Sequence, residues 1–170
     1  DLVSGPSRNY FRPNFWPNTP DILPYHLQHQ GENIFILRLA LAATLSSNYG
    51  VYGPPYEFYD NVPVPGREEY FDSEKYEIKH HDWKKTNRMT DIITLLNLAR
   101  KNNPSLQSTW NMQFCAIENP NLLAFLKATD DLSNIVLMVV NLEPQERQSG
   151  FVQLPKDRLK LGDRINVKVR

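Results

Sequence analysis

The spacing of apolar residues changes at Pro104, and this change limits the folds that the chain can adopt. Before Pro104, segments with helical spacing alternate with short aromatic segments and with proline-rich loops. After Pro104, short apolar segments follow one another roughly every 8–12 residues, separated by turn residues. The sequence therefore predicts an α/β part over residues 1–104 and an all-β part over residues 105–170.

The α/β part is predicted to contain two short strands and two helices. Tyr10–Trp16 is predicted as a strand that runs into a loop, and Asn48–Gly53 as a buried strand. Glu32–Leu45 is predicted as a helix buried on several sides, because apolar residues occupy most of its circumference. Thr90 is expected to cap a second helix, which ends before Pro104. Its apolar residues follow amphipathic spacing: Ile92, Leu95, Leu96 and Ala99.

This order of strand, loop, helix, strand, long loop and helix is typical of the closing units of a TIM-type (β/α)8 barrel. In such a barrel, the loops that follow the strands hold the active site. The corresponding loops here are Pro17–Gln30 and Pro54–Asn87, and both are rich in proline and aromatic residues. Because aromatic residues are interleaved with its charges, the second loop is predicted to be ordered.

The all-β part is predicted to form a partial antiparallel β-sandwich. Its five candidate strands are Trp110–Ile117, Leu122–Ala128, Ile135–Leu142, Gly150–Leu154 and Arg164–Val169. The last candidate strand runs up against the final residue, which would leave an unpaired sheet edge. We therefore expect the chain to be a piece of a longer protein, cut at both ends.

Charge and composition argue against several classes of function. Lys plus Arg and Asp plus Glu both number 19, so the net charge is zero and no nucleic-acid partner is expected. The longest apolar run, Ile34–Leu45, contains Arg38 and is too short to span a bilayer, so no membrane partner is expected. A single cysteine, Cys115, excludes an intrachain disulfide and is predicted to be a buried, inert thiol. A cytoplasmic location fits these features best.

No cofactor or metal is expected from the motifs in the chain. It contains no phosphate-binding glycine-rich loop, no dinucleotide-binding turn, no pair of closely spaced cysteines and no nucleophile elbow. The adjacent His80 and His81 point in different directions on a helix or a strand, so they make a poor metal site. His26 and His29 are expected to lie at the surface or to support other residues.

Two segments are candidates for chemistry, and each also has a plain structural interpretation. Asn18–Asp21 reads as a turn, or as a turn that points the Asp21 carboxylate into a sugar-binding cleft. Pro63–Trp83 reads as a solvated charged loop, or as a loop that pairs aromatic rings with charged groups, as sugar sites do.

The segment Phe11–Ile22 resembles the fourth signature region of glycoside hydrolase family 13, in its maltosyltransferase variant. Ordinary amylases carry Asn-His-Asp at this place, whereas this chain carries Asn-Thr-Pro-Asp at positions 18–21. Four further segments are similar to the same family, the α-1,4-glucan:maltose-1-phosphate maltosyltransferases: Ala40–Ser46, Gly50–Tyr52, Glu68–Ile78 and Val139–Pro144.

The resemblance implies a retaining glycosyltransferase that moves maltosyl units from maltose-1-phosphate to the non-reducing end of an α-1,4-glucan. It implies that Asp21 stabilises the transition state, and that Lys75 and Tyr76 bind the distal glucose of the maltosyl unit. No residue here matches the nucleophile or the acid/base, so the chain alone is expected to be inactive. The resemblance also implies a homodimer.

Two alternatives stay open. The first is an amylase-type hydrolase or a trehalose-forming isomerase that shares the closing barrel units. The second is a stand-alone carbohydrate-binding module, which requires the isolated chain to bind maltose and to lose binding on Tyr76→Ala.

Overall fold

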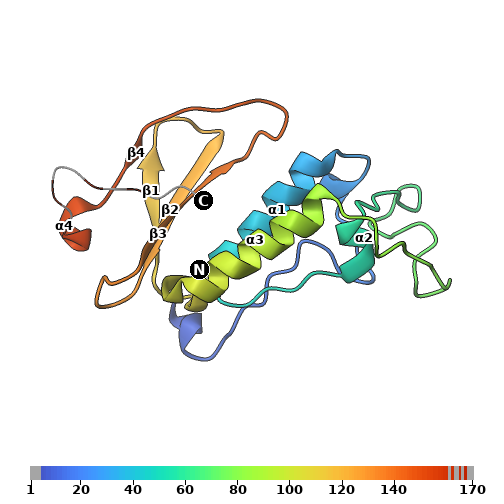
Figure 1. Ribbon diagram of the computed structural model, residues 1–170, viewed down its shortest axis with the longest axis horizontal. Coiled ribbons are helices and arrows are strands. Elements are labelled where there is room, and N and C mark those ends of the chain that lie inside the picture. The colour runs from blue at the N-terminus through green and yellow to red at the C-terminus, as the bar shows by residue number, and fades with distance from the viewer. Residues whose placement is uncertain (1–4, 161, 163–164, 166, 168–170) are drawn as a thin grey trace.

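A computed structural model describes residues 5–160, 162, 165 and 167 of the chain. Helices α1 (Glu32–Leu45) and α3 (Arg88–Asn102) lie side by side, with a β-sheet at one end of the pair (Figure 1). The short helix α2 (Gly53–Glu57) and the long loop after it lie at the opposite end. The described residues also form three 3-10 helices: η1 (Pro6–Asn9), η2 (Tyr25–Leu27) and η3 (Pro104–Gln107).

Helix α1 has the predicted boundaries and is buried on several sides, as predicted. Phe35 and Leu39 are fully buried, and Asn33 is the one exposed residue of the helix. An apolar residue at almost every position gives a helix that must be enclosed by its neighbours. Here α3, η2 and the sheet enclose it.

The two strands predicted in the first half are wrong in extent. One parallel bridge, between Phe15 and Tyr49, replaces them. It is held by the Phe15 N–H, which donates to Asn48 O, and by the Gly50 N–H, which donates to Phe15 O. Pro13 has no N–H to extend the pairing on one side, and Gly53 begins helix α2, with Pro54 at its start, on the other.

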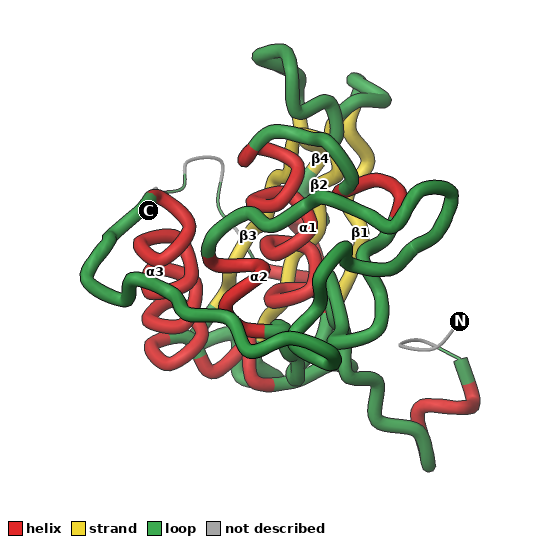
Figure 2. The backbone as a smooth tube through the Cα atoms, turned by 90° about the vertical axis from the view of Figure 1, so that its right-hand side faces the viewer, coloured by secondary structure: helices red, strands yellow, loops and turns green. Residues whose placement is uncertain are grey.

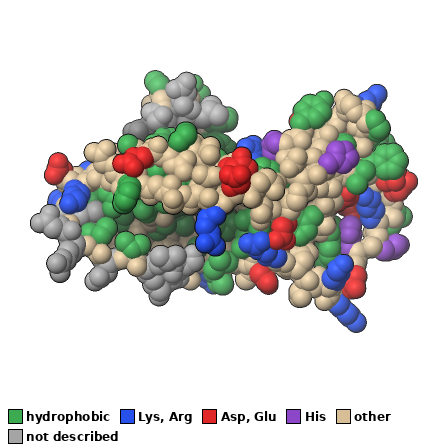
Figure 3. All heavy atoms as spheres, turned by 90° about the horizontal axis from the view of Figure 1, so that it is seen from above, with side chains coloured by type: hydrophobic (Ala, Val, Ile, Leu, Met, Phe, Trp, Pro, Cys, Tyr) green, Lys and Arg blue, Asp and Glu red, His purple; other side chains and the backbone are tan. Residues whose placement is uncertain are grey.

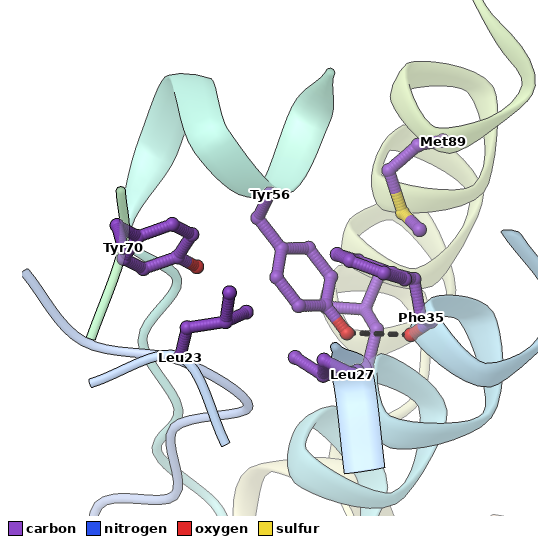
Figure 4. Close-up of a cluster of buried hydrophobic side chains, with 7 residues drawn as sticks. Leu23, Leu27, Phe35, Tyr56, Tyr70 and Met89 are labelled. Atoms are coloured by element: carbon purple, nitrogen blue, oxygen red, sulfur yellow. Dashed lines mark hydrogen bonds between the residues drawn. The ribbon is translucent and has the colours of Figure 1, made fainter. Parts of the chain in front are cut away.

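The long loop after α2 is held to the core by Tyr70, which is buried, and by Tyr59, which packs against the buried cluster, whereas its other large aromatic residues Phe71, Tyr76 and Trp83 are exposed. Figure 4 shows the buried cluster that joins this loop to α1, α3 and the Pro17–Gln30 loop. Its labelled members are Leu23, Leu27, Phe35, Tyr56, Tyr70 and Met89. The Tyr56 hydroxyl also donates to the Phe35 carbonyl oxygen at 2.5 Å, which satisfies its one polar atom.

Helix α3 begins three residues earlier than a cap at Thr90 implies. Asn87 is the N-cap, and its side chain accepts from the Met89 and Thr90 N–H groups. Thr90 completes a reciprocal capping box through its own hydroxyl, which accepts from the Asn87 N–H. Leu95, predicted to face the core, is exposed, whereas Ile92 and Leu96 pack against the core.

The second half forms one curled antiparallel sheet with strand order β3-β2-β1-β4 (Figure 2). The strands are β1 (Met112–Ile117), β2 (Leu122–Ala128), β3 (Ile135–Asn141) and β4 (Val152–Gln153). Four of the five predicted strands are therefore confirmed: β2 has the predicted boundaries, and the other three are shorter than predicted. The fifth, Arg164–Val169, lies largely outside the described residues. A second sheet facing this one is not seen within the described part of the chain.

The two faces of the sheet bury different clusters. One face packs Phe125 and Met138 against Leu106 of η3 and the end of α1. The other packs Cys115 and its neighbours against Leu159 of α4 (Lys156–Leu159), a short helix that the sequence analysis missed. Cys115 is buried as predicted, and burial raises the pKa of its thiol. A raised thiol pKa lowers the thiolate fraction and therefore the reactivity.

Two cationic side chains bind the carboxyl-terminal end of α1, where the first half meets the sheet, and one of them, Lys127, joins the two halves. Arg100 of α3 donates to the Ser46 and Ser47 carbonyl oxygens, at 3.2 and 2.5 Å. The fully buried Lys127 of β2 donates to the Thr44 carbonyl oxygen at 3.2 Å. Carbonyl groups at a helix end carry partial negative charge, so these cations stabilise the junction. None of the helices described here is long and apolar enough to cross a membrane.

Candidate functional site

The three predicted site residues lie together at the surface. The Lys75 Nζ is 3.0 Å from the Asp21 Oδ1, although 54 residues separate them in the sequence. The same ammonium lies 5.5 Å from the centre of the Tyr76 ring. The side chains of Lys75 and Asp21 are 55% and 68% exposed, so a ligand can reach both. The hydrogen bond from Lys75 to Asp21, together with the Asp21 charge, raises the pKa of Lys75.

Asp21 lies at the tip of a tight turn, which both interpretations of its segment predicted. The Thr19 N–H donates to Ile22 O, and the Ile22 N–H donates back to Thr19 O, at 3.1 and 3.2 Å. Pro20 fixes the first corner of this turn. The carboxylate is consequently held away from the core and points outward.

Asn18, the residue directly before this turn, anchors the turn to the core and is only 1% exposed. Its side-chain amide donates to the Tyr70 hydroxyl at 2.7 Å and to the Tyr52 carbonyl oxygen at 3.1 Å. Its side-chain oxygen accepts from the Tyr52 N–H at 3.0 Å. One buried amide therefore ties the turn to α2 and to the long loop, a role that the sequence analysis did not assign.

The Pro63–Trp83 segment is anchored to the first loop and is more than a solvated charged loop. A short antiparallel pairing joins Pro63 to Tyr70. Glu68 then accepts twice from the other loop, because its carbonyl bonds the Leu23 N–H and its carboxylate bonds the Tyr25 N–H. At this end of the molecule, charged, histidine and hydrophobic side chains are interleaved on the surface (Figure 3).

Glu74 lies directly before the Lys75–Tyr76 pair, and both of its oxygens are engaged. The Tyr52 hydroxyl donates to Glu74 Oε2 at 3.0 Å, and His81 Nε2 lies 3.2 Å from Glu74 Oε1. The His81 ring stacks on Phe58 with centroids 5.2 Å apart. Burial, then the hydrogen bond and charge of Glu74, raise the pKa of Tyr52 to about 12, so its hydroxyl remains a donor. In the sequence, the position of Glu74 next to Lys75 is the one feature that draws attention to Glu74 and its contact with Tyr52.

The histidines are not gathered into a ligand set. His81 is occupied by Glu74 and Phe58, and His80 is exposed. Burial and the nearby positive charge of Arg38 lower the pKa of His26. No group of three or more metal-ligating side chains occurs among the described residues.

The cluster of Asp21, Lys75 and Tyr76 can bind a polyhydroxylated ligand. The ammonium and carboxylate offer hydrogen bonds to hydroxyl groups, and the exposed Tyr76 ring offers a surface for the apolar faces of a sugar. A single carboxylate cannot act as nucleophile, acid and stabiliser at once. The cluster is therefore suited to holding a sugar, and covalent chemistry requires further groups.

Comparisons with known proteins bear on this site. A family model described as "GLGE, C-terminal" matches residues 114–170. A protein of Chlorobaculum tepidum is 46% identical over 164 residues, which are 93% of this chain and 24% of that protein. Proteins of Methylacidiphilum infernorum and Rhodospirillum rubrum are 45% and 44% identical over 95% and 96% of the chain. All three are named α-1,4-glucan:maltose-1-phosphate maltosyltransferase, and the chain spans about a quarter of their length, 24% in each case.

Proposed function

Because this chain belongs to the family of the α-1,4-glucan:maltose-1-phosphate maltosyltransferases, we propose that it forms the closing part of the catalytic unit of such an enzyme. The proposed reaction transfers a maltosyl unit from maltose-1-phosphate to an α-1,4-glucan and releases phosphate. The observation that carries the proposal is the contact between Lys75 and Asp21. It lies in a chain that is similar to these enzymes over nearly its whole length.

In the proposed mechanism the enzyme retains the configuration at the sugar carbon. The bond from that carbon to the phosphate oxygen breaks while a bond to an enzyme carboxylate forms. The 4-hydroxyl of the glucan then attacks the same carbon, loses its proton to the acid/base residue and frees the carboxylate. The nucleophile and the acid/base residue are supplied by parts of the enzyme outside this chain.

Asp21 is proposed to stabilise the transition state. The donor ring acquires positive charge as it flattens, and a fixed carboxylate facing it interacts more strongly with that state than with the ground state. The tight turn and the buried Asn18 support this role because they hold the carboxylate in place. Lys75 and Tyr76 are proposed to hold the distal glucose of the maltosyl unit, which their 5.5 Å separation and exposure support.

Residues 1–104 are proposed as the C-terminal part of the (β/α)8 barrel, and residues 105–170 as part of the β-sandwich domain that follows it. The parallel bridge between Phe15 and Tyr49, with α1 between these two residues in the sequence, supports a strand–helix–strand unit of a barrel. The four-stranded antiparallel sheet supports the second domain. A homodimer and a cytoplasmic location are further parts of the proposal, and light scattering of the intact enzyme tests the first.

The test uses the intact enzyme, meaning this chain together with the remainder that its relatives carry. Incubation with maltose-1-phosphate and a malto-oligosaccharide is expected to release phosphate and to lengthen the acceptor by two glucose units per turnover. Production of maltose or trehalose instead would favour the hydrolase or the isomerase. Phosphate release by the isolated 170-residue chain would contradict the assignment of the nucleophile to another part of the enzyme.

The variant Asp21→Asn tests the role of the carboxylate. We expect kcat to fall by roughly 10²–10³-fold with little change in fold, because a stabilising interaction of the transition state is lost. Asp91→Asn is the matched control, since Asp91 is an exposed carboxylate on α3. Near-normal kcat in Asp21→Asn would remove Asp21 from the mechanism.

A further inference from the structure

We propose that Glu74 is a positioning residue, which sets the Lys75–Tyr76 pair against Asp21 through its hydrogen bond with Tyr52. The inference rests on the proposed maltosyl transfer. It concerns how tightly the enzyme binds the distal sugar of its donor. Glu74 itself is directed inward, toward Tyr52 and His81, and is not proposed to touch the substrate.

The geometry fixes Glu74 from two sides. Its side chain is 29% exposed, and its two oxygens meet Tyr52 at 3.0 Å and His81 at 3.2 Å. His81 is itself fixed, because its ring stacks on Phe58 at an interplanar angle of 10°. The backbone around Glu74 is folded as a turn, because the Tyr76 and Glu77 N–H groups both donate to the Ser73 carbonyl oxygen, at 2.9 and 3.1 Å. Anchoring Glu74 within this turn therefore restricts where Lys75 and Tyr76 can lie.

Tyr52 connects both halves of the site. Its backbone N–H and carbonyl oxygen are both bonded to Asn18, three residues before Asp21. Its hydroxyl is bonded to Glu74, one residue before Lys75. The loop that carries Asp21 and the loop that carries Lys75 are therefore both hydrogen-bonded to Tyr52.

The ion pair between Lys75 and Asp21 cannot by itself fix the position of the two loops relative to each other. Lys75 and Asp21 are both mostly exposed, and exposed ion pairs are weak because water and salt screen them. The bond between Tyr52 and Glu74 is part-buried and involves a charged acceptor, and such hydrogen bonds are stronger than neutral, solvated ones. The contact at the surface consequently depends on the contact beneath it.

The expected signature is a rise in KM without a comparable loss of kcat. The distal glucose is held equally in the ground state and in the transition state, so weakening its site reduces uniform binding. For Glu74→Gln and for Tyr52→Phe, we expect KM for maltose-1-phosphate to rise about tenfold, with kcat within about twofold of wild type. A purely structural role would instead lower the amount of active enzyme, and so Vmax, at unchanged KM.

The experiment measures phosphate release by the intact enzyme as a function of donor concentration. Tyr52→Phe keeps the ring, which packs near Tyr70, so it remains informative if a change at Glu74 disturbs folding. The matched control is Glu77→Gln, an exposed carboxylate three residues beyond Glu74, for which KM is expected to stay at the wild-type value.

A combined variant separates positioning from a direct effect. If Glu74 acts through the Lys75–Tyr76 pair, adding Glu74→Ala to the double variant Lys75→Ala with Tyr76→Ala leaves its KM unchanged. A further rise in KM on adding Glu74→Ala would overturn the proposal, as would a wild-type KM in both Glu74→Gln and Tyr52→Phe. A wild-type enzyme that releases no phosphate would overturn the proposed function, whereas the outcomes above overturn the positioning role in an enzyme that is active.

Discussion

Removing the Asn18 side chain is expected to loosen the base of the site, and the structure gives the size of the effect. Asn18→Ala deletes three hydrogen bonds, to the Tyr52 N–H, the Tyr52 carbonyl and the Tyr70 hydroxyl. An intramolecular hydrogen bond contributes about 1 kcal/mol net, so the local free energy of opening should fall by about 3 kcal/mol. A water molecule that enters the vacated space would recover part of this loss.

The amide of Tyr52 reports this change directly, because its N–H donates to the Asn18 side chain. A loss of about 3 kcal/mol corresponds to roughly 100-fold faster hydrogen–deuterium exchange at that amide. Asn18→Asp is expected to be at least as damaging, since a carboxylate cannot donate to the Tyr52 carbonyl and would bury a charge.

Asn33→Ala is the control for this experiment. Asn33 is exposed and makes one hydrogen bond, to the Pro144 carbonyl oxygen, so its loss should leave Tyr52 exchange unchanged. Exchange of the Tyr52 amide within about threefold of wild type in Asn18→Ala would refute the claim that Asn18 holds the two loops together.

Two further predictions concern the junction at the end of α1. Arg100→Met should lower Tm by about 5–10 °C, because at least two charge-assisted hydrogen bonds to the Ser46 and Ser47 carbonyls are lost. Arg100→Lys keeps the charge and should lower Tm less. Equal Tm values for wild type and Arg100→Met would contradict this prediction. Burial, and then the charge of Arg100, lower the pKa of Lys127 to about 8, below its ordinary 10.5. The unfolded chain therefore binds more protons between these values, so the free energy of unfolding should rise from about pH 8 to pH 10.5, and this rise should be absent in Lys127→Met. Urea unfolding at both pH values measures it, and a pH-independent difference between the two proteins would contradict the burial of a charged lysine.

Local patterns determined most of the secondary structure. Helix α1 and strand β2 have the predicted boundaries because their apolar spacing and turn residues lie within a few positions of each other. The start of α3 was missed by three residues because its capping box uses Asn87 and Thr90 together. The two strands of the first half shrank to one bridge because a strand requires a partner along its length, which local pattern does not supply.

The candidate site divides in the same way. The sequence by itself determined which residues to consider, because the Asn18–Asp21 motif and the Lys75–Tyr76 pair both lie in segments that resemble the maltosyltransferases. Only the tertiary structure decided that Lys75 and Asp21 meet at 3.0 Å. The physical reason is that this contact depends on hydrogen bonds between distant residues, made by Asn18 and Tyr52 at the edge of the core, and such bonds form only once the aromatic core has closed beside them.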